Sequence, residues 1–177
     1  MKFCIAKFER EEHLFKSVPS ENTLPAWKKH LGVFLSTGFY SGFFPVAPGT
    51  AGSVVGMVFV YLLRDSGTFL QALSAVFFSV IGVWVSNIAS QVFKKHDPQR
   101  VVIDEIAGVM ITMIGIPLTG YTGVMGFLLF RFFDIVKPIP ANFADRKLKG
   151  GLGIMLDDII AGIYGNIVMH LVMRSQI

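Results

Sequence analysis

The stretch FLQALSAVFFSVIGVWVSNIASQVF, residues 69–93, contains no charged side chain. A helix of this length, rising about 1.5 Å per residue, can cross a hydrocarbon core of about 30 Å. The composition of the whole 177-residue chain agrees with this reading, because 53% of its residues are apolar and only 16% are charged. Soluble domains carry about 25% charged residues. These properties predict an integral membrane protein.

Five further apolar segments flank this stretch, and several are short or interrupted by charge. They cover residues 30–44, 50–63, 101–118, 122–136 and 154–173. Short apolar helices are tolerated in a membrane when neighbouring helices wrap them or when they line a wet cavity. The Gly/Pro-rich FPVAPGTAGS that follows the first segment predicts a re-entrant or broken segment at 31–49. We therefore expect an all-α, multi-pass bundle of about five crossings plus that broken segment.

The N-terminal 30 residues differ from the rest of the chain. They mix Lys, Glu, Arg and His with isolated hydrophobic residues and contain no apolar core or cleavage site of a signal peptide. We divide the chain into a charged tail, residues 1–30, and a membrane domain, residues 31–177. The tail fits either an amphipathic segment on the membrane surface or a solvated extension. The sole cysteine cannot form an intrachain disulfide, and we expect no nucleic-acid partner.

The distribution of charge predicts the orientation of the bundle. We place the N-terminus in the cytoplasm, let 31–49 dip in and return, and let each later segment cross in turn. The inner side then carries Lys28, Lys29, Lys94, Lys95, Arg100, Lys137, Arg146, Lys147 and Lys149, and the outer side carries Arg64 and Arg174. This is the positive-inside bias of a correctly threaded membrane protein. The same threading brings five acids to the cytoplasmic ends of three helices, namely Asp104, Glu105, Asp134, Asp157 and Asp158.

Two acidic pairs enter helices in similar contexts, in IDEIAG at 103–108 and LDDIIAG at 156–162. Neither pair has a basic residue within four positions on its helix, so the four carboxylates need a shared counter-charge. A divalent cation supplies one, and an all-oxygen ligand set favours Mg²⁺ or Mn²⁺ over zinc or copper. The fifth acid, Asp134, lies three residues from both Arg131 and Lys137, so a simple ion pair is an alternative reading for it.

The segment GFYSGFFPVAPGTAGS, residues 38–53, opens the next helix with glycine and hydroxyl residues. A glycine-lined turn at a helix N-terminus offers free N–H groups to an anion. The alternative is a tight turn capped by Thr50 or Ser53, and this segment alone favours neither. Beside Arg131, Lys137 and a bound metal, however, phosphate becomes the preferred anion. A metal, cations and an N–H nest together are the equipment of phosphoryl transfer.

Four blocks carry a resemblance to the phosphatidylglycerophosphatase A family. They are SGFFPVAPGTAGS, VVIDEIAG, FRFFDIVKPIP and DRKLKGGLGIMLDDIIAG, which occur in the family's order within residues 38–162. The resemblance implies a Mg²⁺-dependent enzyme of the bacterial cell (inner) membrane that hydrolyses phosphatidylglycerophosphate to phosphatidylglycerol and inorganic phosphate. It also implies a compact helical fold with a central helix surrounded by others, and an active site that faces the cytoplasm.

The resemblance also implies roles for individual residues. The metal ligands, direct or through water, would be Asp104, Glu105, Asp157 and Asp158. The catalytic acids would be Asp134, Asp104 and Asp158. Asp134 would orient the attacking water, act as a base or serve as a further ligand. The phosphate-binding residues would be Arg131, Lys137, Gly49, Thr50 and Ser53.

An ion-coupled or divalent-metal transporter is the alternative function, because buried acid pairs and broken helices also suit transport. Two features argue for the phosphatase. The acids gather toward one face of the membrane instead of the midplane, and FRFFDIVKP adds cations beside them, which would discourage a cation path.

Overall fold

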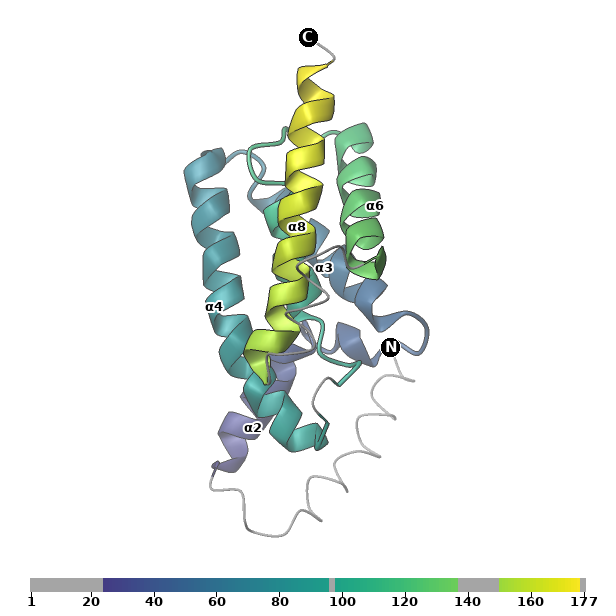
Figure 1. Ribbon diagram of the computed structural model, residues 1–177. Helices are drawn as coiled ribbons and strands as arrows, with labels where there is room; N and C mark the ends of the chain where they lie inside the picture. The colour runs from purple at the N-terminus through teal and green to yellow at the C-terminus, as the bar shows by residue number, and fades with distance from the viewer. Residues whose placement is uncertain (1–23, 96–97, 137–149, 176–177) are drawn as a thin grey trace.

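The computed structural model describes residues 24–95, 98–136 and 150–175, and within these ranges the chain is helical and contains no strand. Six α-helices and one 3-10 turn pack into an elongated bundle (Figure 1). In chain order they are α2 (Ala26–Ser36), η1 (Ser41–Phe43), α3 (Pro48–Leu62), α4 (Gly67–Phe93), α5 (Ile103–Thr112), α6 (Gly120–Val136) and α8 (Gly151–Arg174). The all-α class predicted from the sequence is confirmed.

Two helices, α4 and α8, are long and apolar enough to cross a membrane. Helices α3 and α6 have 15 and 17 residues, and α5 has only 10, which is about 15 Å of helix. The expected count of about five crossings therefore has direct support from two helices. The outward faces of α4 and α8 carry exposed apolar side chains, including Phe69, Phe77, Val80, Ile167 and Leu171, as lipid-facing helices do.

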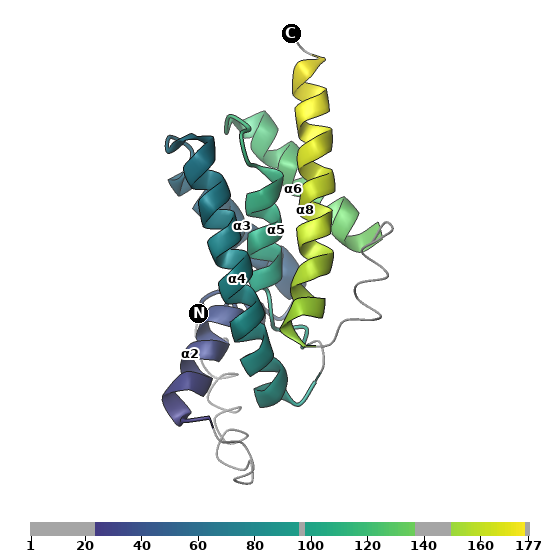
Figure 2. The ribbon, with the colours of Figure 1, turned by 60° about the vertical axis from the view of Figure 1, so that its left-hand side comes forward.

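Helix α5 lies at the centre and packs against α3, α4, α6 and α8 (Figure 2). It ends well before the apolar segment does, because Gly115 adopts a left-handed φ of 72° shortly after the last helical turn. Side chains satisfy the backbone carbonyl and N–H groups that are left without helical partners there. Asn166 Nδ2 of α8 donates to the carbonyls of Thr112 at 3.0 Å and Ile114 at 2.9 Å, and Gly115 N donates to Gln71 Oε1 at 2.9 Å. A helix can therefore stop inside the apolar bundle.

Helices α5 and α8 pack closely, and small residues allow this approach. A Cβ on Gly108 would lie 2.9 Å from the Asp158 carbonyl oxygen, and a Cβ on Gly162 would lie 2.5 Å from the Gly108 carbonyl oxygen. Thr112 Oγ1 donates to the Gly108 carbonyl at 3.0 Å and lies 3.3 Å from the Gly162 carbonyl. Close backbone approach through small residues is the usual device for packing helices in membranes.

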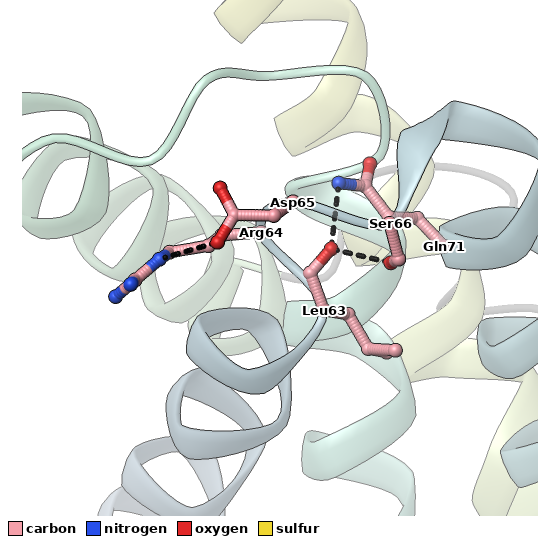
Figure 3. Close-up of polar contacts among 5 residues, drawn as sticks. All are labelled: Leu63, Arg64, Asp65, Ser66 and Gln71. Carbon is pink, nitrogen blue, oxygen red and sulfur yellow. Dashed lines mark hydrogen bonds and ion pairs between the residues drawn. The ribbon is translucent and has the colours of Figure 1, made fainter.

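The turn between α3 and α4 is closed by its own polar side chains (Figure 3). The Leu63 carbonyl accepts hydrogen bonds from Ser66 Oγ at 2.6 Å and from Gln71 Nε2 at 3.3 Å. Arg64 Nε pairs with Asp65 Oδ2 at 3.1 Å on the exposed side of the turn. The turn lies at the end of the bundle that carries the C-terminus of α8 (Figure 1).

The segment predicted to be re-entrant or broken is interrupted. Helix α2 ends at Ser36, three residues at 38–40 have left-handed φ values, and η1 and a loop precede α3. Val102 N donates to the Ser36 carbonyl at 2.9 Å, which ties this segment to the start of α5. Helix α2 begins at Ala26 and so runs across the boundary expected at residue 30. Residues 1–23 of the expected tail lie outside the described ranges.

Candidate phosphoryl-transfer site

Carboxylates from α5 and α8 meet where the N-terminal parts of these two helices lie together. Asp104 and Glu105 occupy the first turn of α5, where the helix dipole favours acidic side chains. Asp158 lies in the second turn of α8. One carboxylate oxygen from each of these three residues lies within 4.8 Å of the other two. Residues more than 50 positions apart in the chain are therefore close enough to share one bound ion.

Asp157 and Asp134 belong to the same cluster. Asp157 interacts electrostatically with Asp104 and with Asp158. Asp134, in the last turn of α6, lies in hydrogen-bond contact with the Asp158 carboxyl group. Asp134 Oδ2 also pairs with Arg131 Nη1 at 2.7 Å, so the ion pair considered from the sequence exists, inside the acidic cluster. The structure thus brings all five predicted acids together.

Within the described residues, the buried carboxylates of the cluster outnumber the positive charges in contact with them. Asp158 is 3% exposed, and Glu105 Oε2 is buried without a hydrogen-bond partner among the described residues. Burying an uncompensated carboxylate is costly, and carboxylates in contact need a proton or a cation between them. Three converging oxygen donors and an unsatisfied oxygen fit a hard divalent cation such as Mg²⁺ or Mn²⁺. The geometry of these carboxylates therefore fits a site for a divalent metal ion.

The start of α3 faces this cluster. A Cβ on Gly49 would overlap Glu105 Oε1 and lie 3.2 Å from Arg131 Nη1, so the bare backbone of Gly49 contacts both side chains. The first intrahelical bond of α3 runs from Ala51 N to the Ala47 carbonyl at 3.2 Å. The N–H groups of the residues before Ala51 precede that bond and are available to an anion.

The remaining predicted phosphate ligands have different surroundings. Ser53 is buried, and its Oγ donates to the Gly49 carbonyl at 2.9 Å, so its hydroxyl proton is used within α3. Thr50 is exposed at the first turn of α3. Arg131 lies in the cluster through its pair with Asp134. Lys137 lies outside the described residues.

The sequence reasoning missed a residue that positions α8. Asn87 Oδ1 of α4 accepts a hydrogen bond from Gly151 N at 2.7 Å, and Gly150, with φ 76°, turns the chain into the helix there. Asn87 therefore caps the helix that carries Asp157 and Asp158. The signal was present, since an amide in an otherwise apolar span usually has a hydrogen-bond partner on another helix.

Comparison with known proteins agrees with these observations. The family model described as phosphatidylglycerophosphatase A matches residues 34–173. Proteins named phosphatidylglycerophosphatase A from Escherichia coli K12 and Haemophilus influenzae Rd are 35% and 38% identical to the chain. These alignments cover 78% and 76% of the chain and 81% and 84% of those proteins, respectively. A Bacteroides thetaiotaomicron protein, provisionally named phosphatidylinositol-3-phosphatase, is 38% identical over 78% of the chain and 91% of its own length. No solved structure matches the chain.

Carboxylates, an arginine and a helix N-terminus gathered in one place are suited to phosphoryl transfer, and two relatives are named as phosphatases of a phospholipid. The chain belongs to the phosphatidylglycerophosphatase A family. It is accordingly an enzyme of the lipid phosphomonoesterase class with a phospholipid substrate.

Proposed function

We propose that this protein hydrolyses the terminal phosphomonoester of phosphatidylglycerophosphate, yielding phosphatidylglycerol and inorganic phosphate, with Mg²⁺ as its cofactor. The observation that carries the proposal is the convergence of Asp104, Glu105 and Asp158, with oxygens within 4.8 Å of one another, inside two of the family's sequence blocks. The names of the Escherichia coli and Haemophilus influenzae relatives support this choice of substrate.

The roles proposed for the side chains follow from their positions. Asp104, Glu105, Asp157 and Asp158 would hold the dication. A bound Mg²⁺ supplies charge neutralisation and polarises the phosphate ester. Arg131 and the first N–H groups of α3 would bind the phosphate oxygens, because Gly49 leaves the Arg131 guanidinium and the helix N-terminus on the same side of the cluster.

Asp134 is proposed to orient the attacking water. Its Oδ2 is held by Arg131 at 2.7 Å, and this pairing fixes the carboxylate as an acceptor for a water hydrogen. In the reaction the water oxygen bonds to phosphorus and the bond to the glycerol oxygen breaks. One proton of the water would pass to the carboxylate of Asp158 or Asp104 and then be delivered to the glycerol oxygen, so that the alcohol leaves neutral.

We further propose a multi-pass protein of the bacterial inner membrane with this site toward the cytoplasm. Besides Arg131 within the cluster, the described basic residues at the end of the bundle nearest the acids are Lys28, Lys29, Lys94, Lys95 and Arg100. The opposite end carries Arg64, in the α3–α4 turn, and Arg174, at the end of α8. This distribution follows the positive-inside rule and supports the orientation.

Phosphate release from phosphatidylglycerophosphate in detergent micelles, with and without a chelator, tests the function. We expect release that stops with chelator and returns with added Mg²⁺. Glu105→Gln and Asp158→Asn should each lower kcat by at least about 100-fold, because each removes a charged donor from the site. Asp65→Asn is the matched control, since the Asp65 side chain is 87% exposed in the α3–α4 turn and its loss should change nothing.

A parallel assay with phosphatidylinositol 3-phosphate addresses the name of the Bacteroides relative. We expect phosphatidylglycerophosphate to be hydrolysed with the higher kcat/KM. Full turnover by both Glu105→Gln and Asp158→Asn, or turnover that is unchanged by the chelator, would refute the assignment of the site.

A further inference from the structure

The loop at residues 44–47, Phe-Pro-Val-Ala, is an exposed apolar segment next to the site. Phe44 is 54% exposed and Val46 is 71% exposed, and the two residues between and after them are exposed as well. Loops between helices are ordinarily polar at such positions. This loop projects sideways from the lower part of the bundle, below α6, between η1 and the start of α3 (Figure 1).

The base of the loop is held firmly. Phe43 is 3% exposed and packs on the ring of Phe93, with centroids 6.5 Å apart, and the Arg100 guanidinium lies 5.2 Å above the Phe43 ring. A Cβ on Gly42 would overlap the Arg100 carbonyl, so the backbone there is in direct contact. The apolar tip is therefore held away from the bundle by a packed base.

The exit from the loop is conformationally strained. Ala47 adopts φ 51° and ψ 65° as the residue before α3, a left-handed conformation that residues with a side chain rarely adopt. Such strain persists where the surrounding structure imposes it, and it is concentrated at functional sites. Here it turns the chain from the exposed tip directly into the helix start whose Gly49 contacts Glu105 and Arg131.

The tip and the site thus form two adjacent surfaces of opposite character. The polar one takes a phosphate, and the apolar one lies two residues earlier in the chain. A molecule that matches both has a charged phosphate head joined to an apolar body, which describes a phospholipid.

We propose that the loop at residues 44–47 inserts into the apolar layer of the leaflet and packs against the acylglycerol part of the lipid substrate. The enzyme would then take its substrate sideways from the plane of the membrane while the phosphate enters the acidic cluster. This inference rests on the proposed function for the identity of the substrate, but the position of the loop in the leaflet can be tested without any activity.

The kinetic test compares two substrates that share a headgroup. One is long-chain phosphatidylglycerophosphate in mixed micelles, and the other is its deacylated, water-soluble headgroup phosphate. The Phe44→Ser, Val46→Ser double variant should raise KM for the lipid roughly tenfold, because it removes two apolar contacts, and leave kcat within about twofold. Its kcat/KM for the soluble headgroup should equal that of the wild type. Val46→Leu should behave as the wild type, and Val58→Ser, 52% exposed elsewhere on α3, is the matched control.

The second test reads the position of the loop directly. In a Cys4→Ser background, an environment-sensitive fluorophore is attached at Val46→Cys, and the protein is placed in lipid nanodiscs. Quenching by nitroxide-labelled lipids, at a level similar to a label at Val58→Cys, is expected. A label at Asp65→Cys should respond to aqueous iodide instead, since that side chain is 87% exposed in a polar turn.

The outcomes separate this inference from the proposed function. Iodide quenching at Val46→Cys without lipid quenching, or an equal loss of kcat/KM on both substrates, overturns the loop proposal while leaving the phosphatase assignment intact. A wild-type protein that releases no phosphate from the lipid refutes the proposed function and, with it, the part of the inference that names the substrate. Lipid quenching at Val46→Cys would then still support insertion of the loop.

Discussion

Substitution of Gly162 by alanine tests whether the contact between α5 and α8 sets the geometry of the acidic cluster. The added Cβ would lie 2.5 Å from the Gly108 carbonyl oxygen, whereas ordinary van der Waals contact begins at 3.4 Å. The two backbones must therefore separate by about 0.9 Å, because no flexible side chain lies between them to give way.

The position of this contact determines what the separation does. Gly162 follows Asp158 by four residues and Gly108 follows Glu105 by three, so the contact lies about one helical turn, 5.4 Å, from the carboxylates. A shift of nearly 1 Å at this contact would move the carboxylates of α5 away from those of α8. Metal–ligand distances must stay within about 0.2 Å of their preferred values, so such a shift would disturb the site. Misplacement of about 1 Å can lower a rate by about 100-fold. We expect kcat for phosphate release to fall 10- to 100-fold and the Mg²⁺ concentration for half-activation to rise.

The overpacked helix pair should also lose about 1–3 kcal/mol of stability, which leaves a folded protein that can be purified and assayed. Gly120→Ala is the matched control, because nothing lies within 4 Å of a Cβ at Gly120. Size-exclusion profile, thermal unfolding and phosphate release are measured for both variants. A Gly162→Ala protein with wild-type kcat and an unchanged Mg²⁺ response would refute the coupling of helix spacing to the site.

Three further predictions address the residues that shape the site. Gly49→Ala should lower kcat by at least tenfold in the phosphate-release assay, because its Cβ would overlap Glu105 Oε1 and displace that carboxylate. Asn87→Leu removes the acceptor of the 2.7 Å bond from Gly151 N and should lower kcat and thermal stability. Asn87→Asp keeps an oxygen at that position and should retain the wild-type kcat. Equal loss in both variants would contradict the capping role. Asn166→Leu removes two hydrogen bonds to the end of α5 and should lower the free energy of unfolding in detergent by about 1–2 kcal/mol; an unchanged value would show that these carbonyls find other partners.

Some features of the fold could be read from the chain because they depend on local sequence. The apolar stretch at 69–93 predicts a helix, and the structure has α4 at Gly67–Phe93. The apolar segment at 154–173 corresponds to α8, Gly151–Arg174. A single long apolar segment in a membrane satisfies its backbone hydrogen bonds within itself only as a helix, so its composition is enough to predict its secondary structure. The early end of α5 at Thr112 could not be predicted, because the apolar pattern continues beyond it. Asn166 of α8 satisfies the Thr112 carbonyl, and Gln71 of α4 accepts from the Gly115 N–H.

The candidate site shows the same division. Local spacing predicted each acid and its need for a counter-charge, since charges without basic neighbours on an apolar helix are conspicuous. The contact of Gly49 with Glu105 and Arg131, and the capping of α8 by Asn87, join residues that lie 56 to 82 positions apart. No spacing rule applies at such separations, because they are set by how closely helices approach.

By itself, the sequence determined that this chain is helical, suited to a membrane and equipped with acids that lack basic partners on their own helices. These are properties of short segments and of composition. Only the tertiary structure decided that oxygens of Asp104, Glu105 and Asp158 lie within 4.8 Å of one another, because Asp158 lies on α8 and reaches the other two through the packing of α8 on α5. It also decided that an apolar loop stands beside the start of α3, since the packing of its base, and not the loop's own sequence, holds it there.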